Sequence, residues 1–180
     1  LQKLAGAYLE RELEDMAGQR TVQVEAWLQA LLPSGQATLV GQIDRLTVDA
    51  DGAAAETMGL GHTLVEYKKN RLPTRGEIFG PEPTSFQLPF YAHLMHSQGW
   101  PVARAVYYSF QQKRFRAFVR PGNEGDRLQL AAAVSSVLDR LRSMSERLRR
   151  GDYSLQDPGK GACADCPFPA LCRMRYVVEP

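Results

Sequence analysis

The N-terminal third of the chain changes from a helical to a strand-like pattern of hydrophobic positions. Residues 1–17 carry apolar side chains at helical spacing with charged residues between them, which predicts an amphipathic helix. Residues 21–31 alternate between two faces, and residues 37–49 and 63–68 are rich in β-branched side chains, so three strands are predicted. The first strand is predicted to place four apolar residues on one face: Val22, Val24, Ala26 and Leu28. Turn-like segments between the strands favour an antiparallel meander.

The rest of the chain predicts two helices and a hairpin. The sequence RLPTRGEIFGPEPTS, dense in Pro and Gly, is predicted as a loop. Residues 85–98 have apolar positions in helical register, with Pro89 near enough to the start to be tolerated. Residues 102–110 and 114–119 are β-rich and bridged by QQKR, which indicates a hairpin. Residues 125–150 predict the longest helix, whose apolar stripe is Leu128, Ala131, Val134, Leu138, Leu141, Met144 and Leu148.

Length and composition fit one globular domain over residues 1–180. The chain is long enough to bury a core, and its 44% hydrophobic and 23% charged residues are ordinary for such a protein. No apolar run reaches the about 18 residues of a membrane-spanning helix, so we expect no membrane partner and a cytoplasmic location. The helical pattern is already under way at Leu1, which indicates a fragment of a longer protein. A net charge of +2 permits a nucleic-acid partner without requiring one.

Two charged residues lie two positions apart in the apolar sequence TLVEYKKN. Glu66 and Lys68 therefore point to the same face of the predicted strand. A solvent-facing ion pair is one interpretation. A second interpretation is a metal site, which requires that the preceding strand bring Asp44 beside Glu66. Two carboxylates in an apolar setting need a cation between them. Asp44 could otherwise cap a turn. Oxygen ligands with open positions suit Mg²⁺ or Mn²⁺, and Lys68 would then orient or deprotonate an attacking water.

Three short sequences, GQIDRL, VEYKK and QLPFY, follow one another in this order. With them the chain resembles the PD-(D/E)xK nuclease superfamily, specifically its RecB-like branch. The resemblance implies an α/β, restriction-endonuclease-like fold with an αβββαβ core, in which helices flank a central mixed sheet. It also implies a DNA nuclease that depends on Mg²⁺ or Mn²⁺.

The resemblance assigns roles to individual residues. Asp44 and Glu66 match the metal-binding acids, and the backbone carbonyl of Tyr67 matches the main-chain metal ligand. Lys68 matches the catalytic lysine, so the implied catalytic residues are Asp44, Glu66 and Lys68. The branch usually also has a metal-binding His on the helix before the strands, but no His precedes His62 here. The remaining ligand is expected either upstream of Leu1 or from one of three acids: Glu10, Glu14 or Glu25.

Four further residues are candidates for DNA contacts. Gln87 and Tyr91 match the Q-x-x-x-Y motif of the RecB-like branch, in which the two motif residues contact DNA. Their i, i+4 spacing places both on one helix face. Lys69 and Arg71 follow the candidate catalytic strand and could neutralise phosphates along a DNA strand. Solvated surface charge is the alternative for these two residues.

The tail, residues 152–180, contains three cysteines in a C-x₂-C-x₅-C spacing: Cys163, Cys166 and Cys172. An odd, clustered set favours a reducing compartment and metal chemistry over a disulfide framework. The spacing resembles the iron–sulfur staple of some RecB-like nucleases. This resemblance implies a 4Fe–4S cluster in the full-length protein and a tail packed on the nuclease domain. A zinc site that borrows a His, or buried cysteines, are the alternatives.

The sequence therefore predicts a metal-dependent DNA nuclease. The resemblance further implies an exonuclease that acts in DNA end processing, repair or recombination, together with helicase domains or subunits. A catalytically inactive DNA-binding or scaffolding domain of the same fold is the alternative, as is an interaction module whose function lies in the cysteine tail.

Overall fold

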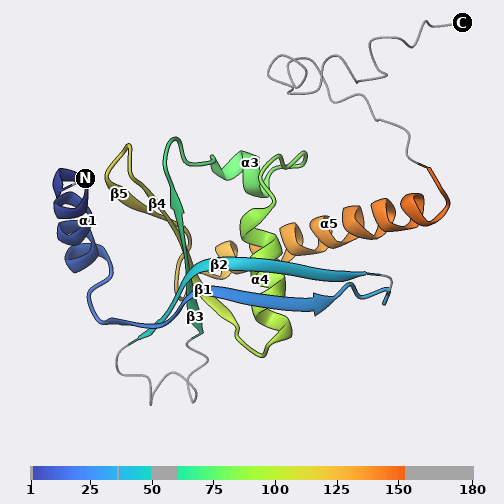
Figure 1. The fold of residues 1–180 in the computed structure, drawn as a ribbon, viewed down its shortest axis with the longest axis horizontal. Helices are drawn as coiled ribbons and strands as arrows, with labels where there is room; N and C mark the ends of the chain where they lie inside the picture. The colour runs from blue at the N-terminus through green and yellow to red at the C-terminus, as the bar shows by residue number, and fades with distance from the viewer. Residues whose placement is uncertain (1, 36, 50–60, 153–180) are drawn as a thin grey trace, which may run out of the picture. The chain divides into compact units, whose positions relative to one another are not determined.

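Five strands of the described chain form one mixed sheet, in the spatial order β1-β2-β3-β4-β5 (Figure 1). The computed structural model describes residues 2–35, 37–49 and 61–152. The strands are β1 (Gln19–Leu31), β2 (Thr38–Asp49), β3 (His62–Lys68), β4 (Val102–Ser109) and β5 (Arg114–Val119). The predicted antiparallel meander of β1, β2 and β3 is confirmed, and so is the hairpin of β4 and β5. β3 and β4 are parallel, which makes the sheet mixed.

The described helices lie before, between and after these strands: α1 (Gln2–Asp15), α3 (Arg75–Phe79), α4 (Gln87–Ser97) and α5 (Glu124–Arg149). α3 and α4 belong to the crossover connection that parallel pairing of β3 and β4 requires. The expected α/β fold, a central mixed sheet flanked by helices, is therefore confirmed.

α3 lies in a segment that the sequence predicts as a loop. The helix has five residues, too few for a hydrophobic period to be visible. It begins in a capping box: the Thr74 side chain accepts a hydrogen bond from the Glu77 N–H, and the Glu77 side chain accepts one from the Thr74 N–H. The T-x-x-E spacing is the sequence signal that could have indicated this helix.

The hydrophobic core lies on both faces of the sheet, because successive residues of β3 point in opposite directions. Leu64 belongs to the larger core, together with Leu94 and Met95 of α4. Val65 belongs to a smaller core with Met16, which follows α1. Different helices therefore cover the two faces of β3, and we call these faces the α4 face and the α1 face.

Two of the predicted apolar stripes are displaced. Val22 and Val24 of β1 are exposed, whereas the second half of the predicted stripe is buried. The prediction was wrong there because a register shift, and a φ of 51° at Glu25, interrupt the alternation on which it depended. In α5, Val134, Leu138 and Leu141 of the predicted stripe pack against the core as expected, whereas Leu128 is exposed. The buried hydrophobic residues of α5 lie one position before members of the stripe and are Leu130, Ala133 and Val137.

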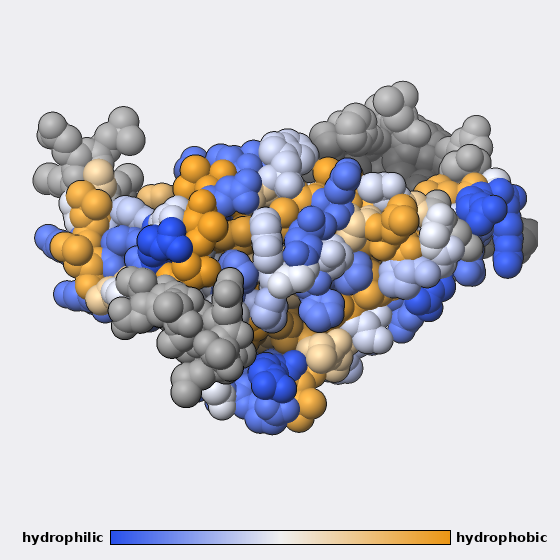
Figure 2. Space-filling model, turned by 90° about the horizontal axis from the view of Figure 1, so that it is seen from below, coloured by the Kyte–Doolittle hydropathy of each residue, from blue (hydrophilic) through white to orange (hydrophobic). Residues whose placement is uncertain are grey.

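Hydrophobic side chains also reach the surface, in scattered groups between hydrophilic residues on the side that Figure 2 shows. Trp27 and Leu31 of the edge strand β1 are the most exposed large hydrophobic residues of the sheet, each at 68%. Such scattered exposure is ordinary for a protein surface.

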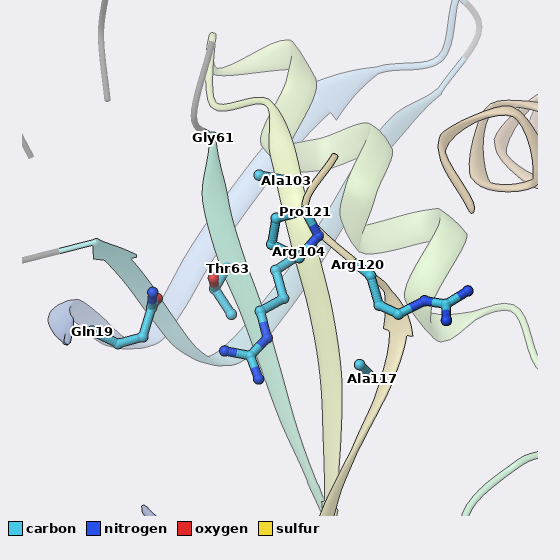
Figure 3. A pocket seen from close by; sticks show the side chains of 8 residues that line it. All are labelled: Gln19, Gly61, Thr63, Ala103, Arg104, Ala117, Arg120 and Pro121. Carbon is cyan, nitrogen blue, oxygen red and sulfur yellow. The ribbon is translucent and has the colours of Figure 1, made fainter. Parts of the chain in front are cut away.

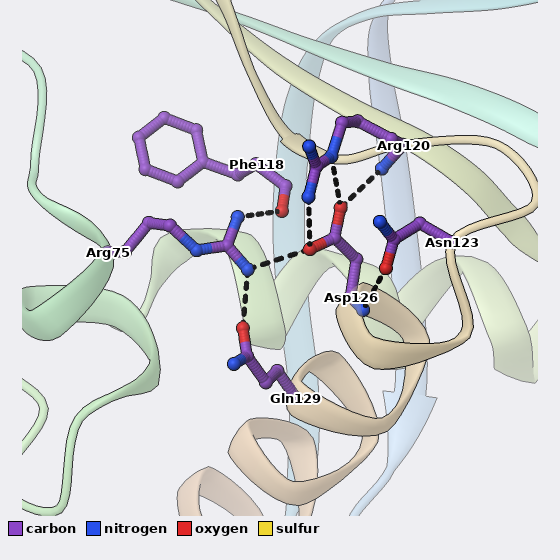
Figure 4. Close-up of polar contacts among 6 residues, drawn as sticks. All are labelled: Arg75, Phe118, Arg120, Asn123, Asp126 and Gln129. Atoms are coloured by element: carbon purple, nitrogen blue, oxygen red, sulfur yellow. Dashed lines mark hydrogen bonds and ion pairs between the residues drawn. The ribbon is translucent and has the colours of Figure 1, made fainter.

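A buried carboxylate joins the ends of three elements (Figure 4). Asp126, in the first turn of α5, accepts hydrogen bonds from Arg75 of α3 and from both the backbone and the side chain of Arg120, which follows β5. Asn123 accepts a hydrogen bond from the Asp126 N–H and so caps α5. The hydrogen bonds from Arg120 lower the pKa of Asp126. One ionised side chain thus fixes α3 and α5 to the end of β5.

The chain divides into two compact units, Leu1–Ser143 and Met144–Pro180. The first contains the sheet, α1, α3 and α4. In the second, Arg147 and Asp152 form an ion pair at the end of α5. The predicted cysteine tail lies almost entirely outside the described residues. Within the described ranges, no helix is long and apolar enough to cross a membrane.

Candidate active site

β2 and β3 stop pairing at the point where their acidic residues meet. The backbone pairs between the two strands end at Arg45 and Val65. One residue further along, the Asp44 carboxylate accepts a hydrogen bond from the Tyr67 N–H at 2.8 Å. The Asp44 N–H in turn donates to the Glu66 carboxylate at 3.3 Å. Side-chain hydrogen bonds therefore replace the ladder here, and the structure brings Asp44 and Glu66 together.

Glu66 is buried, with an exposed fraction of 2%, which excludes a solvent-facing ion pair. Burial raises the pKa of Glu66 to about 8, and the negative charge of Asp44 acts in the same direction. The hydrogen bond from the Asp44 N–H and the charge of Lys68 oppose this increase only in part. The surroundings therefore do not balance the charge of two ionised carboxylates, and the ionised form of Glu66 is disfavoured in the absence of a cation.

Lys68 reaches the carboxylates through an amide. Its Nζ donates to the Oε1 of Gln87, the first residue of α4, and the Nε2 of Gln87 donates to Glu66. An amide suits this position because it presents an acceptor to the ammonium group and a donor to the carboxylate. The Lys68 Nζ also lies 5.4 Å from the ring centroid of the buried Tyr107. Lys68 is thus held on the α4 face beside Glu66.

A glycine lets α4 approach the strands closely enough for these contacts. A Cβ atom at Gly41 of β2 would lie 2.8 Å from both Leu94 and Tyr91 of α4, and this is closer than side chains pack. Tyr91 lies one turn after Gln87 and is half-buried, and this burial raises its pKa. Gln87 and Tyr91 therefore share the helix face that meets the site.

The two basic residues after β3 have different surroundings. Lys69 is exposed. Arg71 is also exposed, but its guanidinium donates to both oxygens of Glu77, at 2.8 Å each. Phosphate binding by Arg71 would compete with this pair, whereas Lys69 is accessible as it stands.

The other acids considered as ligands do not join the two carboxylates. Glu10 and Glu14 are exposed on α1. Glu25 lies between Val24 and Ala26, which pair with the two neighbours of Asp44, but its carboxylate accepts a hydrogen bond from Gln42. His62 lies beside Trp100 at the opposite end of β3 from Glu66. Among the described residues, no group of three or more His, Cys, Asp or Glu side chains is placed to hold a metal ion. Cys163, Cys166 and Cys172 lie outside the described residues.

A pocket of about 350 Å³ lies away from these residues (Figure 3). Thr63, Arg104 and Ala117 line it on the α1 face, near the start of β3 and β4. Glu66 and Lys68 lie on the other face at the far end of β3, so this pocket contains none of the predicted site residues.

The donor atoms at the end of the β2–β3 ladder fit a divalent cation. The carboxylates of Asp44 and Glu66 supply hard oxygen ligands, and their uncompensated charge favours a cation that binds both. The backbone carbonyl of Tyr67, between Glu66 and Lys68, is a further oxygen of the same kind. These atoms leave positions open for water or phosphate oxygens.

A family model described as the PD-(D/E)XK nuclease superfamily matches residues 1–173. The chain belongs to this superfamily. Membership implies nuclease activity, and superfamily members typically use divalent metals, which agrees with the chemistry of the two carboxylates. The mixed sheet with flanking helices is the restriction-endonuclease-like fold of the superfamily. No curated protein matches the chain.

Proposed function

We propose that the protein is a metal-dependent DNA nuclease of the RecB-like branch. The observation that supports it most strongly is the convergence of Asp44, Glu66 and Lys68 at the end of the β2–β3 ladder. Glu66 is buried there although burial and the neighbouring Asp44 both disfavour its ionised form, a combination that is common at functional sites.

Asp44, Glu66 and the carbonyl of Tyr67 would hold Mg²⁺ or Mn²⁺. When bound, the cation supplies Lewis-acid stabilisation of the charge that develops on the phosphate. Lys68 orients the attacking water or offsets charge on the phosphodiester, since Gln87 fixes its ammonium group beside Glu66. Gln87 therefore contributes by holding the Lys68 ammonium group beside the Glu66 carboxylate.

DNA contacts are assigned to the surroundings of this site. Gln87 and Tyr91 face it from α4, and Lys69 extends from the end of β3 into solvent. Arg71 would join them by exchanging Glu77 for a phosphate. Because these contacts are largely electrostatic, DNA binding should weaken as salt concentration rises.

The resemblance to RecB-like nucleases supports the wider role. It favours an exonuclease that processes DNA ends in repair or recombination and that acts together with helicase domains or subunits. In the full-length protein, Cys163, Cys166 and Cys172 would contribute to a 4Fe–4S cluster. The cluster would fasten the tail and take no part in cleavage.

One observation favours a second candidate, a catalytically inactive DNA-binding domain of the same fold. Only Asp44 and Glu66 supply side-chain ligands at the site among the described residues, whereas the RecB-like branch usually adds a histidine. This candidate predicts DNA binding without cleavage.

Cleavage of linear DNA by the purified chain in Mg²⁺ or Mn²⁺ separates the two candidates. We expect cleavage that EDTA abolishes, and about a 100-fold or greater loss in Asp44→Asn and in Lys68→Met, because each removes a charge at the reacting phosphate. Asp139→Asn is the matched control, since Asp139 is an exposed acid paired with Arg142 on α5. Equal cleavage by Asp44→Asn and Asp139→Asn would refute the proposal.

A further inference from the structure

A partly buried polar network lies on the α1 face, directly behind the candidate active site. The guanidinium of Arg45 pairs with both carboxylate oxygens of Glu12, at 2.8 and 3.2 Å. The Tyr8 hydroxyl donates to Glu12 at 2.9 Å, accepts from Arg45 at 3.1 Å and lies 2.9 Å from the Tyr67 hydroxyl. These four residues, which we call the α1 network, link helix α1 to both β2 and β3.

Each strand residue of the α1 network is a direct neighbour of a candidate metal ligand. Arg45 follows Asp44 in β2, and Tyr67 follows Glu66 in β3. Alternation along a strand turns Arg45 and Tyr67 to the α1 face while their neighbours contribute to the site. A displacement of either side chain therefore moves the backbone that carries a ligand.

The strands need such a support at this position. Backbone pairing between β2 and β3 ends at Arg45 and Val65, so no further ladder bonds fix Asp44 relative to Tyr67. Among the described residues, the two segments are joined on the site side by the hydrogen bond from the Tyr67 N–H to Asp44 and by the one from the Asp44 N–H to Glu66. On the opposite side, the α1 network supplies the connection that the ladder lacks.

We propose that the α1 network positions the metal-binding segment, so that Tyr8, Glu12, Arg45 and Tyr67 act as positioning residues for the divalent cation. The proposal rests on the proposed function, because it assigns Asp44, Glu66 and the Tyr67 carbonyl as ligands. Its physical basis is that ligands hold a metal well only when the groups behind them fix their orientation.

Tyr67→Phe tests this assignment, because it removes one hydroxyl of the network and keeps the ring. We expect Mn²⁺ affinity, measured by titration calorimetry on the metal-free chain, to fall about tenfold, as for the loss of other groups that orient metal ligands. Nuclease activity should recover as the Mn²⁺ concentration is raised. Tyr8→Phe should behave similarly, and combining it with Tyr67→Phe should cost less than the sum, since the two changes break the same hydrogen bond.

Tyr108→Phe is the matched control. Tyr108 is buried in the same aromatic cluster, with its ring centroid 5.1 Å from that of Tyr8, but its hydroxyl has no hydrogen-bond partner among the described residues. We expect its Mn²⁺ affinity to equal that of the wild type. Hydrogen exchange of the Tyr67 amide in metal-free protein adds a second measurement, which should become faster in Tyr8→Phe and not in Tyr108→Phe.

The outcomes separate this proposal from the proposed function. If the wild type binds Mn²⁺ and cleaves DNA, but Tyr67→Phe binds Mn²⁺ equally well, the positioning role is refuted and the nuclease assignment stands. If Tyr67→Phe lowers the unfolding temperature but leaves the Mn²⁺ affinity unchanged, the positioning role is also refuted, because the network then supports the fold alone. If the wild type binds no Mn²⁺ and cleaves no DNA, the proposed function fails and this proposal fails with it.

Discussion

Consecutive residues of β2 and β3 belong to two sites with opposite electrostatics. At the candidate active site, Asp44 and Glu66 bring two carboxyl groups together where burial disfavours the ionised form of Glu66. On the α1 face, Arg45 and Glu12 bring opposite charges together, and the Tyr8 hydroxyl forms a hydrogen bond with each of them. Under the two proposals above, this difference separates a binding site from its support: the carboxyl pair would be neutralised by a bound cation, whereas Arg45 and Glu12 neutralise each other within the fold.

Removing the charge on the α1 face should destabilise the protein most. Arg45→Met leaves the Glu12 carboxylate without its cationic partner and removes one hydrogen bond to Tyr8, and we expect the free energy of unfolding to fall by about 3 kcal/mol. Urea denaturation measures this. Arg11→Met is the control, because the exposed pair of Arg11 with Glu14 should contribute about 0.5 kcal/mol or less. Equal losses in the two variants would contradict the contrast between a buried network and surface charge.

A methyl group between α4 and β2 should disturb the active site through its packing. In Gly41→Ala the new Cβ would lie 2.8 Å from both Leu94 and Tyr91, and we expect a loss of about 2 kcal/mol with reduced nuclease activity. The matched control is Gly6→Ala on α1, where nothing lies within 4 Å of the added atom. It should stabilise the protein by about 0.5–1 kcal/mol through helix propensity. A neutral Gly41→Ala would show that α4 does not need this close approach.

Removing a charge at the candidate active site should stabilise the metal-free protein. Asp44→Asn keeps an oxygen for the Tyr67 N–H and replaces a repelling oxygen beside Glu66 by an amide donor. We expect the metal-free variant to gain about 1 kcal/mol in unfolding free energy while it loses activity. Thermal unfolding in EDTA measures the gain. Adding Mn²⁺ should raise the unfolding temperature of the wild type and not that of Asp44→Asn. If metal-free Asp44→Asn is less stable than the wild type, repulsion between the two carboxylates is contradicted.

The smallest expected effect concerns Asp126, a carboxylate whose charge the fold does balance. Its pKa is lowered in the folded state, so its contribution to stability is complete above its unfolded pKa and is lost as pH falls below about 4. The stability difference between wild type and Asp126→Asn should therefore shrink between pH 7 and pH 3. Denaturation at the two pH values measures it, with Asp139→Asn as an exposed control. A difference independent of pH would contradict the role of the ionised form.

Local patterns in the sequence predicted most of the fold because they reflect local physics. Alternation and helical periods gave the strands, the hairpin and the long helices close to their observed bounds. The pattern failed where the backbone departs from regularity, at the register shift between Thr21 and Gln23 and at the positive φ of Glu25. It also failed at α3, which is too short to show a period. At α5 the period was visible, but which side of the helix meets the sheet is decided by contacts with distant residues.

The features of the candidate site also divide into those that the sequence determines and those that depend on the tertiary structure. The sequence by itself determined which carboxylates, lysine and Q-x-x-x-Y residues are present and that Glu66 and Lys68 share a strand face, since side-chain direction in a strand follows from sequence spacing alone. Only the tertiary structure decided that Gln87 bridges Lys68 to Glu66, that Arg71 is paired with Glu77, and that the α1 network stands behind the site. Each of these depends on how segments far apart in the chain meet, and no local pattern records that.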